Sequence, residues 1–329
     1  MIDPSARVRD NVFANPDQWA TRDGFGWGIV EAAKEDANII ALSADLTEST
    51  RLEGFKKEFP GRFVQVGVAE QNLAALASGF AAYGKIPFIC SYATFSPGRN
   101  NEQIRTTIAL NHVPVKVCGM HAGVSVGPDG ATHQALEDIA LMRIIPNMVV
   151  ISPCDGEEAR KATIAAAKYD GPVYLRFARE KTPMITSRET PFEIGKAITL
   201  WRSDAPQVAI FATGPLLHNA LIAARELQGQ GIGATVVDVH TIKPIDVEAI
   251  TRESSAAGAV VTVEEHQIAG GLGSAVAEVL AQHSPLPIEF IGVRDQFGQS
   301  GTPQELIEHY GMNPAHIIEA AKKVIARKQ

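Results

Sequence analysis

Cysteine, aromatic residues and long apolar runs are all scarce in this sequence. The 329 residues include three cysteines, Cys90, Cys118 and Cys154, and no CxxC pair, so we expect neither a disulfide framework nor a zinc site. Cys90 and Cys118 lie in apolar, strand-like runs that are typical of buried thiols. No run reaches the roughly 18 apolar residues of a membrane span. The first ten residues also lack the apolar stretch of a signal peptide, and we therefore expect a cytoplasmic protein.

Positive charge is also in deficit. The sequence has 30 lysines and arginines against 37 acidic residues, a formal net charge of −7. The basic residues are scattered along the chain, which argues against a nucleic-acid interface and against a polybasic membrane patch. Hydrophobic residues make up 45% of the chain, which is enough to fill the cores of two domains.

Strand-like and helix-like segments alternate from about residue 21 onward. Short apolar runs predict strands at 38–42, 86–90, 114–118, 147–151 and 172–177. Helices are predicted at 70–83, with Gly84 as a C-cap, and at 102–110, 134–143 and 156–168. This β-α-β alternation predicts an α/β domain with a mainly parallel sheet and helices on both of its faces.

The alternation breaks at 181–195, where prolines and hydroxyl residues without a period indicate a linker. A second series then predicts strands at 207–212, 233–238, 259–264 and 286–291, and helices at 216–228, 272–282 and 314–327. We predict an N-terminal arm (1–19) followed by two consecutive doubly wound domains, 20–188 and 189–329.

Three loops of the first domain concentrate polar residues. The first, 43–49 (SADLTES), follows the strand 38–42. Ligands of open parallel sheets collect at the carboxyl ends of strands, but Asp, Ser and Thr also cap helices. On this loop alone we favour the cap.

The second loop places Glu70 between the apolar strand FVQVGV and an Ala-rich helix. A carboxylate in the first turn of a helix is stabilised by the helix dipole. A carboxyl group at a dry junction could instead share a proton with a ligand. Composition does not decide between these two interpretations.

The third loop, HAGVSVGPDGATHQ, contains His121, Asp129 and His133 among three glycines that let the backbone approach a ligand closely. Separate surface histidines and an Asp-Gly turn would explain the same residues. The spacings of helical metal sites are missing, and we expect no metal ligands in this chain.

Taken in order, GVAEQN, YATF and HAGVSVGPDGATHQALEDIALMRIIPNM resemble the pyrimidine-binding domain of transketolases. Further along, VAIFATGPLL, TIKPID and EEHQIAGGLGSAV resemble the C-terminal domain of that family. The resemblance covers about residues 20–329. It implies a thiamine-diphosphate enzyme that transfers two-carbon ketol units between sugar phosphates.

The resemblance implies roles for single residues on the cofactor side. Glu70 matches the glutamate that hydrogen-bonds N1′ of the aminopyrimidine and thereby helps to activate the cofactor. Phe95 matches an aromatic residue that packs on the pyrimidine ring, and Asp45 matches an acidic residue near the cofactor at the subunit interface. The family often places a further aromatic residue shortly before the Glu-Gln-Ile-Arg stretch, where this chain has Asn100 and Asn101.

On the substrate side, His121 and His133 match histidines that line the sugar channel, where they would assist proton transfers. Asp129 matches an aspartate that hydrogen-bonds a sugar hydroxyl. The positions that hold the substrate phosphate match Arg22, Ser49 and Arg179. Arginine suits this role because its planar fork binds phosphate oxygens in pairs.

One family motif is missing from this chain. No Gly-Asp-Gly occurs in the sequence, whereas full-length transketolases use this motif to hold Mg²⁺ and the cofactor diphosphate. The resemblance therefore implies a partner, an N-terminal subunit that carries the diphosphate-binding domain and most of the Mg²⁺ ligands. It also implies self-association through the C-terminal domain in an α₂β₂-like complex.

Other interpretations stay open from the sequence. A 2-oxoacid dehydrogenase β subunit has this domain pair but usually lacks the GxDGxTHQ loop, and a deoxyxylulose-phosphate synthase shares a similar loop within a longer chain. An inactive scaffolding subunit would be expected to lose several of the matched residues. In the C-terminal domain, His266 could face the active site or satisfy a backbone group, which we prefer, and the glycine run 270–273 is weak evidence for a phosphate loop.

Overall fold

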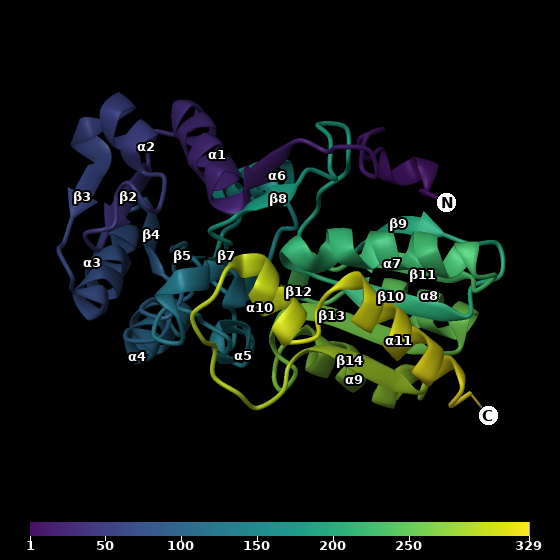
Figure 1. The fold of residues 1–329 in the computed structure, drawn as a ribbon. Coiled ribbons are helices and arrows are strands. Elements are labelled where there is room, and N and C mark those ends of the chain that lie inside the picture. Colours follow the sequence, from purple (N-terminus) through teal and green to yellow (C-terminus); the bar gives the residue numbers. More distant parts are fainter. Residues whose placement is uncertain (329) are drawn as a thin grey trace.

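The computed structural model describes residues 1–328, which form two α/β lobes side by side (Figure 1). The N-terminal segment runs from the first lobe across to the second, where Asp3 N–H donates to the Leu200 carbonyl. Ala6 and Val12 are buried in the core of the second lobe. The predicted fold class, two consecutive α/β domains, is confirmed. Within residues 1–328, every helix is too short or too polar to cross a bilayer.

The first lobe is built on a seven-stranded sheet in which only the edge strand β12 runs antiparallel to its neighbour. In sheet order the strands are β12 (Thr241–Lys243), β6 (Val149–Ile151), β7 (Val173–Arg176), β5 (Lys116–Met120), β4 (Ile86–Tyr92), β2 (Ile39–Ser43) and β3 (Phe63–Gln65). One face is covered by α1 (Thr21–Glu35), α2 (Glu53–Glu58) and α6 (Gly156–Lys168). The other face is covered by α3 (Glu70–Ala82), the π-helix η3 (Ile104–Ala109) and α5 (Asp138–Arg143).

The second lobe is a five-stranded sheet whose edge strand β9 is antiparallel. Its strands in sheet order are β14 (Ile288–Val293), β13 (Val260–Gln267), β10 (Val208–Ala212), β11 (Ala234–Asp238) and β9 (Ile198–Arg202). The helices of this lobe are α7 (Leu217–Gly229), α8 (Val247–Ala257), α9 (Leu272–His283), α10 (Pro303–His309) and α11 (Pro314–Ile325). Because β12 comes from this half of the sequence but extends the first sheet, the two lobes share backbone hydrogen bonds.

Small residues allow the closest packing in the first lobe. Helices α1 and α6 cross where Gly24 faces Gly156, and a Cβ on Gly24 would collide with the Gly156 carbonyl.

The Asp155 side chain caps α6 by accepting from Glu158 N–H at 2.9 Å. It also accepts from the backbone N–H groups of Ile185 and Thr186. This buried carboxylate therefore anchors the predicted linker as well as the helix.

The structure corrects several predicted elements. The helix predicted at 102–110 is one short turn, α4 (Asn101–Gln103), followed by the π-helix η3. The helix predicted at 134–143 begins only at Asp138, because residues 134–137 are irregular and Ala135 forms a β-bridge with Ala122. The linker contains β8 (Lys181–Pro183), which pairs with β1 (Gln18–Ala20) of the N-terminal region.

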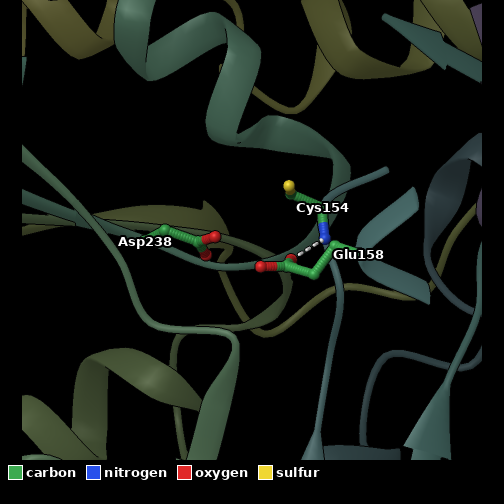
Figure 2. Close-up of side chains that lie close together, drawn as sticks. All are labelled: Cys154, Glu158 and Asp238. Atoms are coloured by element: carbon green, nitrogen blue, oxygen red, sulfur yellow. Dashed lines mark hydrogen bonds between the residues drawn. The ribbon is translucent and has the colours of Figure 1, made fainter. Parts of the chain in front are cut away.

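A buried acidic pair lies at the junction of the lobes (Figure 2). Glu158 of α6 accepts a hydrogen bond from Cys154 N–H at 2.7 Å, and Asp238 ends β11 of the other lobe. Ligand atoms of Cys154, Glu158 and Asp238 lie within 4.8 Å of one another. Burial raises the pKa of Glu158 to about 6. Burial, together with the Glu158 charge, also raises the pKa of Asp238 well above its ordinary value.

Candidate functional site

The candidate site lies at the carboxyl ends of β2, β4 and β5, the edge where ligands of open parallel sheets bind. Glu70 begins α3 beside these strand ends, and its side chain is only 3% exposed. Its carboxylate accepts from Ser91 Oγ at 3.3 Å and from Arg99 Nη1 at 3.2 Å. The positive end of the helix dipole further favours a carboxylate here.

The loop after β4 surrounds Glu70. Asn100 is fully buried, and its Nδ2 donates to the Glu70 carbonyl oxygen at 3.0 Å and to Ser96 Oγ at 3.1 Å. The guanidinium of Arg99 lies 4.0 Å from the ring centre of Phe95. Asn100, which stands in the stretch where the family often has an aromatic residue, therefore supports the backbone at Glu70.

Tyr92 connects the aromatic groups of the site. Its ring stacks on His121 with 4.1 Å between ring centres, and lies 5.9 Å from Phe95 and 6.0 Å from His133. His133 in turn meets Phe95 edge-on at 5.4 Å. The YATF motif contains Tyr92, but sequence reasoning assigned a role only to Phe95. The alternation of side chains along a strand could not show that Tyr92 would bridge two loops.

A second group of contacts joins Arg22, Ser49 and His121. Arg22 Nη1 donates to His121 Nε2 at 2.9 Å and to the Ser49 carbonyl at 3.1 Å. Burial, together with the charges of Arg22 and Arg179, lowers the pKa of His121 to about 3. The imidazole is therefore neutral, with Nε2 accepting a hydrogen bond.

The glycine-rich loop carries Asp129, which forms an ion pair of 3.2 Å with Arg179. The second lobe holds this loop in place. Glu265 of β13 accepts from Ser125 N–H at 2.5 Å, and α10 packs against the turn η4 (Val124–Asp129). Gln134 Nε2 donates to carbonyls of the loop and of Gln299. The C-terminal domain, for which the resemblance implies a role in self-association, thus also supports the candidate substrate loop.

Asp45 stands apart from these contacts. It follows β2 with a positive φ of 62°, and its backbone N–H donates to Gln65 Oε1 at 2.7 Å. Within residues 1–328, its exposed carboxylate forms no hydrogen bond with the other candidate residues. Asp45 therefore takes no part in the three groups of contacts around Glu70, His121 and Asp129.

Two features of the second lobe have structural explanations. His266 is fully buried, and its Nδ1 donates to the Gln267 carbonyl at 2.6 Å. Glu264 accepts from the N–H groups of Leu272 and Gly273, both at 2.7 Å. A carboxylate thus already occupies the start of α9, where a phosphate loop would hold its anion.

Comparison with known proteins decides the family. The transketolase pyrimidine-binding domain matches residues 17–184, and the transketolase C-terminal domain matches residues 195–317. The chain belongs to the transketolase family. Glu70 and the loops around it lie within the pyrimidine-binding domain.

Relatives of this transketolase-family chain include proteins of matching length. A 6-deoxy-6-sulfo-D-fructose transketolase subunit of Clostridium sp. (strain MSTE9) is 42% identical, over 93% of this chain and 95% of its own. One of the apulose-4-phosphate transketolase subunits of Phocaeicola vulgatus is 37% identical, over 94% and 98%. A solved split-gene transketolase, described as an inactive β₄ tetramer, has a TM-score of 0.88 and 44% identity over 94% and 99%. By contrast, the chain spans about half of full-length mammalian transketolases, such as 50% of the rat protein.

Proposed function

We propose that this chain is the C-terminal subunit of a split, thiamine-diphosphate-dependent transketolase. It would move a two-carbon ketol unit from a ketose phosphate to an aldose phosphate. The observation that carries the proposal is the buried Glu70 carboxylate, which shares Arg99 with the Phe95 ring. His133 packs edge-on against that ring.

The residues around Glu70 fit the aminopyrimidine of the proposed cofactor. A buried carboxylate accepts hydrogen bonds from a protonated ring nitrogen, and an aromatic face packs on a flat heterocycle. Both groups already interact with one planar, N–H-bearing side chain, that of Arg99. When bound, thiamine diphosphate would supply the carbon acid and the electron sink needed to break and form the C–C bond.

The other residues would bind and orient the sugar. Arg22 and Arg179, with Ser49, would hold the terminal anion, and Asp129 would bind a hydroxyl. His121 would act as a hydrogen-bond acceptor, because its pKa of about 3 leaves it neutral. His133 lies edge-on to Phe95 and would move protons between sugar hydroxyl and alkoxide.

The partner and the assembly belong to the same proposal. An N-terminal subunit would bind the diphosphate of the cofactor and supply most of the Mg²⁺ ligands, because no Gly-Asp-Gly motif occurs in this sequence. Support comes from relatives of matching length that are named as transketolase subunits. We expect an α₂β₂ complex in the cytoplasm, with Asp45 reaching the cofactor at the contact between subunits.

Reconstitution tests this function. The chain would be mixed with candidate diphosphate-domain subunits, thiamine diphosphate and Mg²⁺, and ketol transfer would be assayed with sugars bearing a terminal phosphate or sulfonate. We expect activity only in the mixture. Activity of the isolated chain would rule out the split arrangement, and oxidative decarboxylation of a 2-oxoacid without ketol transfer would favour the dehydrogenase alternative.

A further inference from the structure

Arg99 makes both of the contacts that a bound aminopyrimidine would need. Its Nη1 donates to Glu70 Oε2 at 3.2 Å, and its guanidinium lies 4.0 Å from the centre of the Phe95 ring. A guanidinium and an aminopyrimidine share the relevant chemistry, because both are flat, delocalised and carry N–H donors. One side chain thus satisfies the carboxylate and the aromatic face together.

We propose that Arg99 is a place-holder, whose guanidinium occupies the aminopyrimidine position of the free chain and leaves when the cofactor binds. This inference rests on the proposed function. It adds a regulatory contact at the same site, in which the apo subunit keeps its cofactor position closed.

The charge of Glu70 explains why a place-holder is needed. A buried carboxylate that lacks a charged or hydrogen-bonding partner is costly. The Glu70 side chain is 3% exposed, and Ser91 at 3.3 Å supplies its other side-chain donor among the described residues. Arg99 therefore compensates the carboxylate until a cofactor nitrogen can do so.

The position of Arg99 also allows its side chain to move away from Glu70. Its side chain is 51% exposed while it bonds to Glu70, so rotation about its own torsions would carry the guanidinium into solvent. Asn100, in contrast, is fully buried and holds the Glu70 carbonyl. The neighbouring Asn100 contact can thus remain in place while Arg99 moves.

The experiment is a calorimetric titration of the assembled two-subunit complex with thiamine diphosphate in the presence of Mg²⁺. The variants are Arg99→Met, Glu70→Gln and the double variant, with the exposed Arg105→Met as the matched control. Arg99→Met keeps the length of the side chain but removes its charge and its donors. A part-buried ion pair and a cation–π contact together predict a Kd for Arg99→Met that is roughly fivefold to thirtyfold lower than in the wild type. Arg105→Met should leave the Kd unchanged.

The double variant separates the possible outcomes. If Arg99 acts by competing for Glu70, Arg99→Met should improve binding much less in the Glu70→Gln background. A higher Kd in Arg99→Met would overturn the place-holder and would make Arg99 a cofactor contact. An unchanged Kd in Arg99→Met would also overturn the place-holder. The proposed function would still stand in that case if Glu70→Gln weakened the binding of thiamine diphosphate. Failure of every assembled complex to bind thiamine diphosphate would instead refute the proposed function.

Discussion

At the scale of single residues, the charge of His121 depends on its basic neighbours. Its pKa is lowered to about 3, first by burial and then by the charge of Arg22. Replacing Arg22 with Gln removes a positive charge, so protonation of His121 should cost less and its pKa should rise by roughly one unit or more. Titration of the His121 ring signals by NMR would check this.

Arg105→Gln is the control for the His121 titration, because its exposed side chain belongs to none of the site contacts. A His121 pKa that stays near 3 in Arg22→Gln would mean that burial alone sets it. In the assembled enzyme, Arg22→Gln should raise the KM for sugar phosphate more than it lowers kcat, because the substitution removes a contact to the substrate anion.

The sequence could predict the site residues whose types are tied to chemistry, but not their mutual contacts. Glu70 and Phe95 could be proposed as candidates because they belong to ordered motifs. Arg99 lies only four residues beyond Phe95, yet its contacts depend on the turn of the 95–99 loop and on which rotamer it adopts. Asp45, predicted from the same kind of match, lies outside these contacts.

At the scale of elements, the glycine-rich loop depends on support from the second lobe. Gly123 has a φ of 90°, and a Cβ there would collide with the Glu265 carboxylate. Gly123→Ala should therefore strain the backbone and push Glu265 from Ser125, lowering the free energy of unfolding by at least about 2 kcal/mol. Chemical denaturation of the free chain would measure the loss.

Gly79→Ala is the matched control, since Gly79 lies within α3 and a Cβ there would meet nothing within 4 Å. This variant should stabilise the free chain by roughly 0.5–1 kcal/mol, because alanine is the better helix former. If Gly123→Ala proved as stable as the wild type, the lobe-to-loop contact would not be holding the loop.

Periodicity predicted the strong elements and missed those set by tertiary contacts. The strands β2, β5 and β10 are buried along their whole length and mostly apolar, with Ser43 and Lys116 as the polar exceptions, and their positions were predicted within two residues. The π-helix η3 and the late start of α5 at Asp138 have no signature in a helical period. The pairing of β12 with β6 joins residues about ninety positions apart, which no local pattern encodes.

At the scale of the whole molecule, the Glu158–Asp238 pair couples the joining of the lobes to pH. Two buried carboxyl groups this close, with Asp155 also nearby, cannot all ionise at low cost. The pKa of Glu158 rises from an ordinary 4.5 to about 6, and that of Asp238 also rises. Between about pH 4.5 and pH 6, Glu158 therefore binds more protons in the folded chain than in the unfolded chain. Its contribution to the free energy of unfolding should fall as the pH rises through this range.

Asp238→Asn should remove much of this pH dependence. The change preserves shape and takes away one buried charge, so stability at pH 8 should increase by roughly 1–2 kcal/mol. Thermal unfolding of the free chain at pH 5 and pH 8 would measure it, with the exposed Asp10→Asn as the control. A lower stability of Asp238→Asn at pH 8 would show that the pair is held by an interaction that needs its charge.

The central claim is that Glu70 activates a cofactor whose diphosphate end is held by another chain. The most direct measurement is the exchange of the thiazolium C2 proton of thiamine diphosphate for deuterium, followed by NMR in the assembled complex. Wild-type complex should exchange this proton orders of magnitude faster than the free cofactor, and the isosteric Glu70→Gln variant should lose most of that acceleration while still binding the cofactor. Equal exchange rates in the wild-type and Glu70→Gln complexes, at equal occupancy, would contradict the account.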